Sequence, residues 1–463
     1  MQKIIIDNFA AIEHLEMELD WNLDLVIGPQ ASGKSALAKL VFFCRKIRDY
    51  LTDYLTNPIV SDFYGKNPSR PPFRNFTLYL TRQFMRYFGK TTEIKGHFVV
   101  KYFYDDDPDG EETGHWVKLR LNDEGYLLVQ FSPQMYRSIR SYLREAEERL
   151  GSAYSLAHSK GLEEYNSLKE SAKAYFSKMS ADLFHDTQEL IYIPAGRSIL
   201  SYLSDNVEFT LTDLLLDDYV KRIRALRPRF TRSLSGMISE YVHTSGQEID
   251  EEDVSLAAEL VRHILRADYR YDLDSGEERL YYSKKDFTDI RFASSGQQES
   301  LWILQLMFLI ILEKRRTFLV LEEPEVHLFP FAQKAMVELI ALLIHATGSS
   351  VFVTTHSPYI LTSANLSIYS AQAEPDWKSE QEEPVVPPSL RIEPDRFGAY
   401  MISNQEGFSF ESIQDPETGL IDAFRIDQVS EVLNRETDRI TYRKARAEIL
   451  YKAQSPKERR EHP

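Results

Sequence analysis

The chain has 463 residues, of which 43% are hydrophobic, and its formal net charge at pH 7 is −16. This length predicts two or three domains, or one domain with a large insertion, and the negative charge argues against a protein that coats nucleic acid nonspecifically. The single cysteine, Cys44, excludes an internal disulfide framework and is expected to be a small core residue. Because the N-terminus shows no secretory signal and the longest apolar helix expected, 301–312, is too short to cross a bilayer, we expect a cytoplasmic protein with no membrane partner.

A phosphate-binding pattern follows the first predicted strands, near 2–8, 12–19 and 23–27. The segment Gly28-Pro-Gln-Ala-Ser-Gly-Lys-Ser35 fits G-x-x-x-x-G-K-[ST] and precedes a predicted helix. Backbone N–H groups of such a loop and the N-terminus of the next helix attract phosphate, so we expect a nucleoside triphosphate here. Lys34 would add charge, and Ser35 would be a hydroxyl ligand for Mg²⁺. The other residues expected to contact the nucleotide are Gly28, Gln30, Ala31, Ser32, Gly33 and Ala36.

Three more strands, predicted near 97–104, 116–121 and 126–131, would complete an N-terminal β lobe. The connection between the first two contains an acidic run, Asp105-Asp-Asp-Pro-Asp109, followed by Glu111 and Glu112. We interpret this run as a solvated hairpin loop rather than a metal cluster, because it lies between two strand-like segments.

From Pro133 to Asp186 the pattern is helical and highly charged, and a break near 159–161 predicts a hairpin of two helices. One continuous helix would reach roughly 80 Å at 1.5 Å per residue, and the hairpin about half of that. A strand predicted at 191–193 then leads into Pro-Ala-Gly-Arg197. Arg197 could stabilise charge near a nucleotide or could form a structural salt bridge.

A second helical portion, predicted over 206–267, contains a basic segment with two aromatic residues nearby. The segment could grip a phosphate backbone or an acidic partner, or it could be a solvated helix face paired with neighbouring acids. Its basic residues are Lys221, Arg222, Arg224, Arg227, Arg229 and Arg232.

Strands near 269–273 and 279–282 lead to Phe292-Ala-Ser-Ser-Gly-Gln-Gln-Glu299 and a long apolar helix, 301–312. Small residues that open a helix make an anion site. Such a site is of little use to the chain's own nucleotide if it lies far from the phosphate loop.

Two apolar runs carry the remaining polar residues of the expected site. Thr317–Leu321 is typical of a strand buried in a parallel sheet, and it ends in Glu322-Glu323-Pro-Glu325. We assign Glu322 to Mg²⁺ and Glu323 to the attacking water, because each needs an oxygen acceptor. A further strand, 350–355, precedes His356, which could reach the γ-phosphate as a sensor. Glu325 and His327 are expected to shape the loop between these strands.

The order of these motifs resembles that of ABC-type ATPases, in the branch that contains SMC-like, RecF-like and OLD-family proteins. In that family two heads sandwich two ATP molecules, and the signature of each head caps the γ-phosphate held by the other. The resemblance implies that Ser295 and Gly296 contact the partner's ATP, that Glu323 is the general base and that His356 is the switch histidine. The sequence departs from the pattern of transporter-type members at Gln297, where they usually have a second glycine.

Two other positions also depart from the pattern or are harder to match to it. Glu322 is the expected metal ligand, where aspartate is usual. Gln83 is the candidate for the glutamine loop that normally follows the first helix.

We therefore predict an α/β fold, an ABC-type P-loop ATPase head with an N-terminal β lobe and a helical insertion. Residues 1–132 would form the N-terminal part of the head and 133–267 a mainly helical insertion, with a core strand near 189–198. Residues 268–370 would complete the head. Residues 371–463 would be a C-terminal extension, with a small unit that has strands near 399–403 and 407–412 and a helix from about Ile426.

The chain is also similar to stand-alone ATPase subunits of bacterial anti-phage modules such as Septu and PARIS. The resemblance implies a sensor or scaffold that uses ATP and Mg²⁺, forms a head-to-head dimer or a higher oligomer, and controls a separate effector, a nuclease or toxin. A nucleic acid or a phage protein would be the trigger. The segment after 370 shows no D-x-D pattern or H-N-H cluster, so the effector would be another chain. The alternatives are a DNA-repair clamp resembling RecF-like proteins and a scaffold with negligible turnover.

Overall fold

The centre of the molecule is a mainly parallel β-sheet. The computed structural model describes residues 2–19, 21–57, 71–90, 97–105, 114–160, 162–201, 213–246, 249–373, 384–404, 407–422, 438–444 and 446. Within these residues the central sheet has six strands in the order β14-β13-β3-β12-β11-β7. Only β14 runs antiparallel to its neighbour. The strands are β3 (Leu23–Ile27), β7 (Glu189–Ile193), β11 (Thr317–Glu322), β12 (Ser350–Thr355), β13 (Phe397–Ser403) and β14 (Ser409–Ser412).

A second sheet, antiparallel throughout, forms the N-terminal β lobe. In the described part of the chain it has five strands in the order β2-β1-β4-β5-β6. The predicted strands are confirmed almost to the residue, because the alternation of buried and exposed side chains is regular in this lobe. The strands are β1 (Lys3–Phe9), β2 (Ile12–Glu18), β4 (Val99–Phe103), β5 (Trp116–Leu121) and β6 (Leu127–Phe131).

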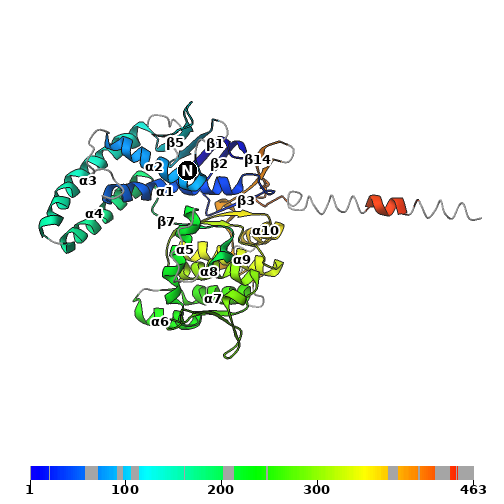
Figure 1. Cartoon of the computed structure of the whole chain (residues 1–463). Coiled ribbons are helices and arrows are strands. Elements are labelled where there is room, and N and C mark those ends of the chain that lie inside the picture. Colours follow the sequence, from blue (N-terminus) through cyan, green and yellow to red (C-terminus); the bar gives the residue numbers. More distant parts are fainter. Residues whose placement is uncertain are drawn as a thin grey trace, which may run out of the picture.

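The first helix, α1 (Lys34–Thr56), lies between the β lobe and the central sheet, with α2 (Pro72–Phe88) packed against it (Figure 1). Cys44 is fully buried there, as predicted, and burial raises the pKa of its thiol. On the same helix Arg45 and Arg48 are buried and both pair with Asp186, at 2.9 and 3.3 Å. These ion pairs fix α1 to the chain that enters β7.

The predicted helical hairpin is confirmed as α3 (Pro133–Lys160) and α4 (Leu162–Leu183), which form an arm on the side of the β lobe (Figure 1). The base of the arm packs on α1, so its apolar residues belong to the same core as the lobe.

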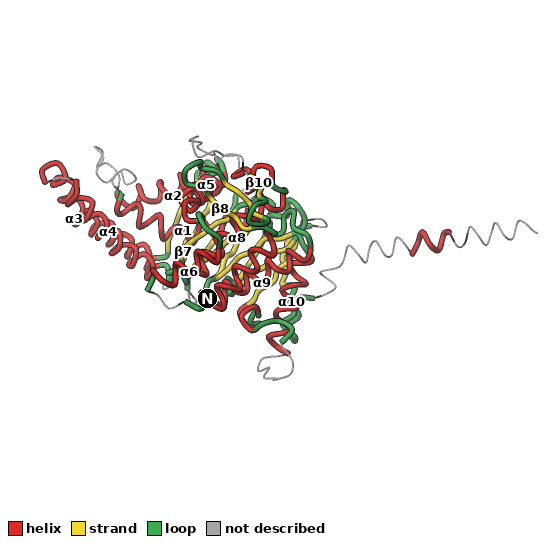
Figure 2. The backbone as a smooth tube through the Cα atoms, turned by 90° about the horizontal axis from the view of Figure 1, so that it is seen from below, coloured by secondary structure: helices red, strands yellow, loops and turns green. Residues whose placement is uncertain are grey.

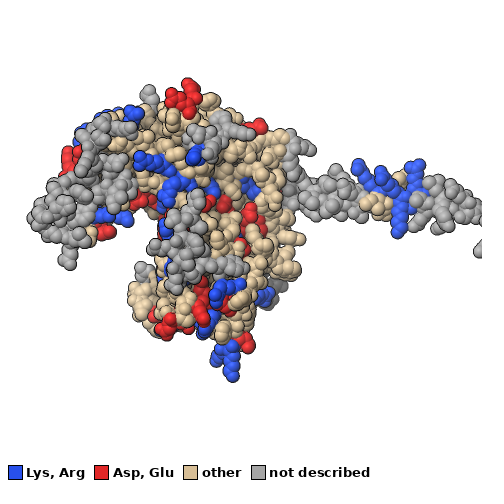
Figure 3. Space-filling view, viewed as in Figure 1, with Lys and Arg blue, Asp and Glu red and all other residues tan. Residues whose placement is uncertain are grey.

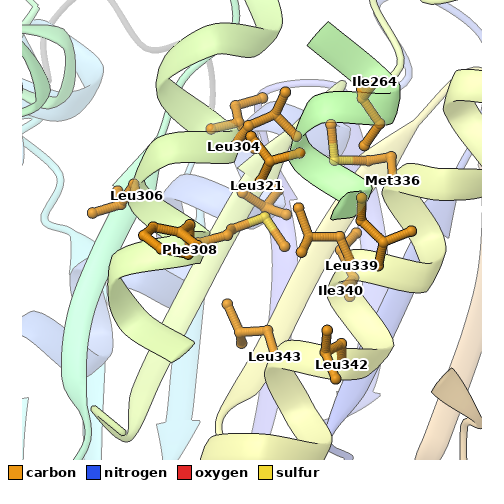
Figure 4. Packing of buried hydrophobic residues seen from close by; sticks show 14 of the residues in the cluster. Ile264, Leu304, Leu306, Phe308, Leu321, Met336, Leu339, Ile340, Leu342 and Leu343 are labelled. Carbon is orange, nitrogen blue, oxygen red and sulfur yellow. The ribbon is translucent and has the colours of Figure 1, made fainter. Parts of the chain in front are cut away.

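The other helices cover the opposite face of the central sheet (Figures 1 and 2). Helices α7, α8 and α9 share a second core, in which leucines of α8 and α9 meet Leu321 of β11 and Ile264 of α7 (Figure 4). In the described residues no helix is both long and apolar enough to cross a membrane. The helices are α5 (Leu214–Leu226), α6 (Leu234–Thr244), α7 (Glu251–Leu265), α8 (Ser295–Leu312), α9 (Pro330–Thr347) and α10 (Pro358–Ala373).

A small antiparallel sheet leads into α8. Over the described residues its strand order is β10-β9-β8, with β8 (Asp268–Tyr271), β9 (Glu278–Tyr281) and β10 (Phe287–Asp289). The helices expected as one insertion therefore lie in two places, the arm beside the lobe and α5 to α7 beyond the central sheet. The α/β class with a β lobe and helical insertions is confirmed, whereas the domain boundaries stay a prediction.

The two strands expected near 399–403 and 407–412 are present as β13 and β14, and they extend the central sheet. β13 pairs in parallel with β3, and β14 pairs with β13. The buried residues of β13, among them Ala399 and Ile402, complete the two cores on either side of the sheet. The helix expected from about Ile426 lies, as far as residue 437, outside the described residues.

Candidate functional site

The phosphate loop connects β3 to α1, and its shape depends on glycines. Gly33 has a left-handed backbone (φ 109°), and a Cβ there would lie 2.8 Å from the side chain of Ile12. A Cβ on Gly28 would lie 2.0 Å from the carbonyl oxygen of Ile402 in β13, so only glycine fits. Asn404 donates from Nδ2 to the carbonyl of Ala31 at 3.1 Å. The C-terminal strand thus supports the loop, a role that the sequence did not reveal.

Lys34, the first residue of α1, folds back over the loop. Its Nζ donates to the carbonyls of Gly28 and Pro29 at 2.8 and 2.7 Å. Burial lowers the pKa of Lys34 to about 8, against the opposing influence of Glu323 and Glu325. The lysine is therefore close to these carboxylates and lacks full hydration, so a phosphate would stabilise its charged form.

Glu322 and Ser35, the residues expected to bind the metal, have side chains that suit Mg²⁺. Glu322, the last residue of β11, is buried, and its Oε2 accepts a hydrogen bond from the backbone N–H of Ala195 at 3.2 Å. Its Oε1 is also buried and makes no well-formed hydrogen bond among the described residues, although the phenol of Tyr192 lies close enough to interact with this carboxylate. A buried carboxylate oxygen is costly unless a donor, a cation or water meets it. Ser35 is exposed at the start of α1, where its hydroxyl can be a further ligand.

Glu323 and His356 lie next to each other at the end of the central sheet. Glu323 has a left-handed backbone (φ 46°), and its N–H donates to the carbonyl of Thr354 at 2.9 Å. A non-glycine residue in this region is strained, which is common at functional sites. Its Oε1 lies 3.2 Å from Nε2 of His356, and both side chains are partly exposed. A carboxylate held in this way can accept a proton from a water molecule.

Glu325 supports the histidine from behind. Its Oε1 accepts hydrogen bonds from the hydroxyl of Thr355 and from the backbone N–H of His356, both at 2.7 Å. Beyond the loop-shaping role that the sequence predicts for Glu325, the geometry shows that it also fixes the backbone of His356.

The structure decides between the two roles that the sequence left open for Arg197, a charge-stabilising contact near the nucleotide and a structural contact. It is 1% exposed, and its guanidinium donates to the carbonyls of Pro194, Glu322, Glu323 and Glu299 at 2.8, 2.6, 3.0 and 3.1 Å. The carboxylate of Glu299 in turn accepts the backbone N–H of Arg197 at 3.0 Å. Because its guanidinium nitrogens all face carbonyls, Arg197 is a structural link between α8 and the turn that holds Glu323.

The signature opens α8 as predicted. Ser294 caps the helix and forms a reciprocal pair with Gln297, which explains why glutamine stands where transporter-type members have glycine. Ser295 is exposed, and a Cβ on Gly296 would lie 2.7 Å from the carbonyl oxygen of His327. The signature and the loop after Glu325 therefore pack together beside a cavity of about 910 Å³.

Gln83 lies within α2, where its side-chain oxygen accepts a hydrogen bond from the guanidinium of Arg86, one turn further along the same helix. Its role in metal binding stays a prediction.

The basic segment is largely neutralised by neighbouring acids. Five of its six cations form ion pairs, and in Figure 3 basic and acidic atoms lie side by side over the lower helices. This favours the interpretation of a paired helix face. The pairs are Lys221–Asp217, Arg222–Glu189, Arg227–Glu278, Arg229–Glu313 and Arg232–Glu240.

Comparison with protein families agrees with this geometry. The family described as AAA ATPase domain matches residues 1–361, which include the phosphate loop, Glu323 and His356. The chain belongs to the AAA ATPase domain family. The predicted class of P-loop ATPase is thereby confirmed. No curated protein matches the chain.

Among solved structures the chain is similar to three SMC heads. One is an SMC head bound to the C-winged helix domain of ScpA, with 12% identity, a TM-score of 0.41 and coverage of 90% of this chain and 98% of that chain. Another is the SMC head domain from Thermotoga maritima, with 10% identity, a TM-score of 0.33 and coverage of 89% and 98%. The third is an SMC head with an extended coiled coil, bound to the C-terminal domain of ScpA derived from Pyrococcus furiosus, with 11% identity, a TM-score of 0.36 and coverage of 94% and 100%.

Proposed function

We propose that the chain hydrolyses ATP to ADP and phosphate at the site formed by the phosphate loop, Glu322, Glu323 and His356. The observation that carries this proposal is the pairing of Glu323 with His356, 3.2 Å apart, close to the phosphate-loop lysine. A carboxylate that only stabilised the fold would not need a strained backbone and partial exposure.

The residues divide the work as follows. The loop N–H groups and Lys34 bind the phosphates, and Glu323 accepts a proton from the water whose oxygen attacks the γ-phosphorus. The bond to the bridging oxygen breaks, and ADP leaves with the electron pair. His356 then lies where it can donate to a γ-phosphate oxygen. Ser35 and Glu322 would hold Mg²⁺, whose charge offsets that of the phosphates.

Glu323→Gln tests the assignment, because the amide keeps the shape of the side chain but cannot accept the proton. We expect ATP binding close to that of the unchanged protein and turnover lower by at least about 100-fold, the usual contribution of a general base. Binding is measured by calorimetry and turnover by phosphate release. Glu240→Gln, on the distant helix α6, is the matched control and should leave both unchanged. Unchanged turnover in Glu323→Gln would refute the assignment.

We further propose that two copies close head to head around ATP, with Ser295 and Gly296 of one copy contacting the nucleotide of the other. Phe292, Phe329 and Phe331 support this proposal, because they are 79%, 70% and 72% exposed and flank the signature. Exposed aromatic side chains in one patch are typical of a protein interface.

Dimer formation is tested by light scattering after size exclusion with Glu323→Gln, which should trap the ATP-bound state. A dimer with ATP and a monomer without it is the expected result. Adding Ser295→Arg should abolish the dimer while a single chain still binds ATP. A dimer that forms regardless of ATP would contradict the sandwich.

For the cellular role we propose a sensor or scaffold that controls a separate effector, probed most simply in anti-phage defence. The proposal rests on the resemblance to such ATPase subunits and on the arm, α3 and α4, which packs on α1, the helix that begins at the phosphate loop. The tagged chain should co-purify with a nuclease or other toxic protein from its native context, and phage infection should release or activate it. Recovery with DNA and no effector would favour the repair clamp instead.

The DNA-clamp alternative is weakened by the ion pairs of the basic segment. A clamp would show DNA-stimulated turnover with a steep salt dependence, lost on neutralising Arg229 and Arg232. We expect DNA to leave turnover unchanged.

A further inference from the structure

Three potential metal ligands, Asp105, His115 and His185, meet at the edge of the β lobe. Asp105 follows β4 and His115 precedes β5, and the antiparallel pairing of these strands brings the two residues together. The N–H of Tyr104 donates to the carbonyl of His115 at 2.8 Å, which extends the pairing to this point. His185 comes from the turn after α4 and has a left-handed backbone (φ 47°).

Their ligand atoms converge on one point. Nδ1 of His115 contacts Oδ2 of Asp105, and Nε2 of His185 lies 3.4 Å from Nδ1 of His115 and 3.8 Å from Oδ2 of Asp105. A tetrahedral ion with ligands at 2.0–2.1 Å places neighbouring ligand atoms about 3.3 Å apart. Small shifts would therefore admit such an ion. Among the described residues this is the only group of three or more histidine, cysteine or acidic side chains with this arrangement.

Hydrogen bonds among the three side chains cannot satisfy all of their polar atoms. Nδ1 of His115 faces both the carboxylate and the other imidazole nitrogen, and one ring N–H cannot serve both well. The other carboxylate oxygen of Asp105 is already occupied by the backbone N–H of His115, at 3.0 Å. The rings meet edge to face with centroids 4.7 Å apart, so each presents a nitrogen to the common point. A cation could accept one lone pair from each of the three side chains at the same time.

The His185 side chain is 48% exposed, whereas those of His115 and Asp105 are 13% and 25% exposed. An ion could therefore enter from solvent and keep a water molecule as a fourth ligand.

We propose that Asp105, His115 and His185 form a binding site for a transition-metal dication of the Zn²⁺ class. Two imidazoles and one carboxylate select such an ion over Mg²⁺ or Ca²⁺, which prefer oxygen ligands. The proposal does not depend on ATP hydrolysis, since the three residues belong to the lobe and the base of the arm.

The site would join the arm to the lobe. His185 is followed by Asp186, whose carbonyl accepts from Arg48 at 2.7 Å and whose carboxylate pairs with Arg45. Both arginines lie on α1, the helix that begins at the phosphate-loop lysine. The ion would thus fix the base of the arm one residue away from its attachment to α1.

The test uses the full chain, stripped with EDTA and then titrated with Zn²⁺ and Co²⁺ without nucleotide. We expect one metal per chain by elemental analysis, the visible absorption of tetrahedral Co²⁺, and a higher melting temperature with Zn²⁺. His185→Ala and Asp105→Asn should each weaken binding by more than about tenfold, the loss seen when only an outer-shell partner of a metal ligand is removed. Far-UV circular dichroism and ATP binding confirm that these variants are folded.

Two controls separate this site from others. His14→Ala removes a histidine of the same lobe whose Nδ1 lies 2.7 Å from Asp7 in an exposed pair, and it should not change metal binding. His356→Ala removes the histidine of the nucleotide site and should also leave binding intact. No stoichiometric binding, or binding that survives in His185→Ala and Asp105→Asn, would overturn the proposal. Loss of binding in His356→Ala alone would assign the ion to the nucleotide site and overturn it as well.

Discussion

The end of the central sheet and the start of α8 present their polar residues in opposite ways. Within one chain Glu323 lies 3.2 Å from His356 and near enough to Lys34 to affect its pKa. Buried contacts from Arg197 and Glu325 hold the backbone of Glu322, Glu323 and His356. Ser295 is exposed instead, and Phe292, Phe329 and Phe331 near the signature are exposed as well. One chain therefore contains the groups that we propose for proton transfer and metal binding. The signature faces outward, which is the arrangement expected of a site that a second copy completes.

Arg197 is where the two regions meet, and removing it should have the largest effect. Arg197→Ala removes the cation that faces the buried Glu299 carboxylate at 3.6 Å, and it removes the donor to the carbonyls of Glu322 and Glu323. We expect a loss of about 3–5 kcal/mol in the free energy of unfolding, typical of breaking a buried ion pair. Turnover should fall as well, because the turn at Glu323 loses its support. Urea unfolding and phosphate release measure the two effects.

Arg232→Ala is the matched control, because its pair with Glu240 is exposed and should contribute less than about 1 kcal/mol. Equal losses of stability in the two variants would show that Arg197 is not the link between α8 and the catalytic turn.

Glu325→Gln tests whether Glu325 supports the hydrolysis step rather than ATP binding. The amide retains one oxygen for Thr355 and the N–H of His356 but loses the negative charge, so the switch histidine is held less firmly. We expect kcat to fall by about tenfold, at the lower end of the effect of a misplaced catalytic group, with little change in KM. Steady-state kinetics measures both constants. An increase in KM alone would show that Glu325 acts in ATP binding instead.

The smallest expected effect is a dependence of ATP affinity on pH. Burial lowers the pKa of Lys34 to about 8, and bound phosphate should raise it again. The free protein loses the lysine proton as the pH rises through about 8, whereas binding requires the charged form. The apparent affinity for ATP should therefore be constant below pH 7 and weaken by up to about tenfold per pH unit above 8.

Calorimetry in buffers of different ionisation enthalpy should show proton uptake on ATP binding near pH 8. Lys34→Arg keeps its charge and should remove both the uptake and the pH dependence. An affinity that is flat up to pH 9.5 in the unchanged protein would contradict the lowered pKa.

Local patterns in the sequence predicted much of this site. The strands before Gly28 and Glu322, the helix that begins near Ser295 and the hairpin of α3 and α4 follow from apolar runs, glycines and breaks, each of which acts over a few residues. The positions of Glu323 and His356 follow because neighbouring parallel strands end at the same edge of a sheet.

Contacts between distant segments could not be predicted in this way. The pairing of β13 with β3 and the contact of Asn404 with the phosphate loop join residues more than 370 positions apart. Likewise the acidic run at Asp105 gave no indication of His185, which reaches it only because α4 returns along α3 to the lobe. The four carbonyl partners of Arg197 come from three separate segments, so its sequence context left two roles open.

The most direct test of a site shared between two copies is complementation between variants. Lys34→Ala cannot hold ATP but keeps its signature, whereas Ser295→Arg keeps its phosphate loop but cannot complete a partner's site. Each alone should be inactive. A mixture should regain a substantial part of the turnover, because the mixed dimer contains one complete site. A mixture that stays inactive, or full turnover by Ser295→Arg alone, would contradict the account.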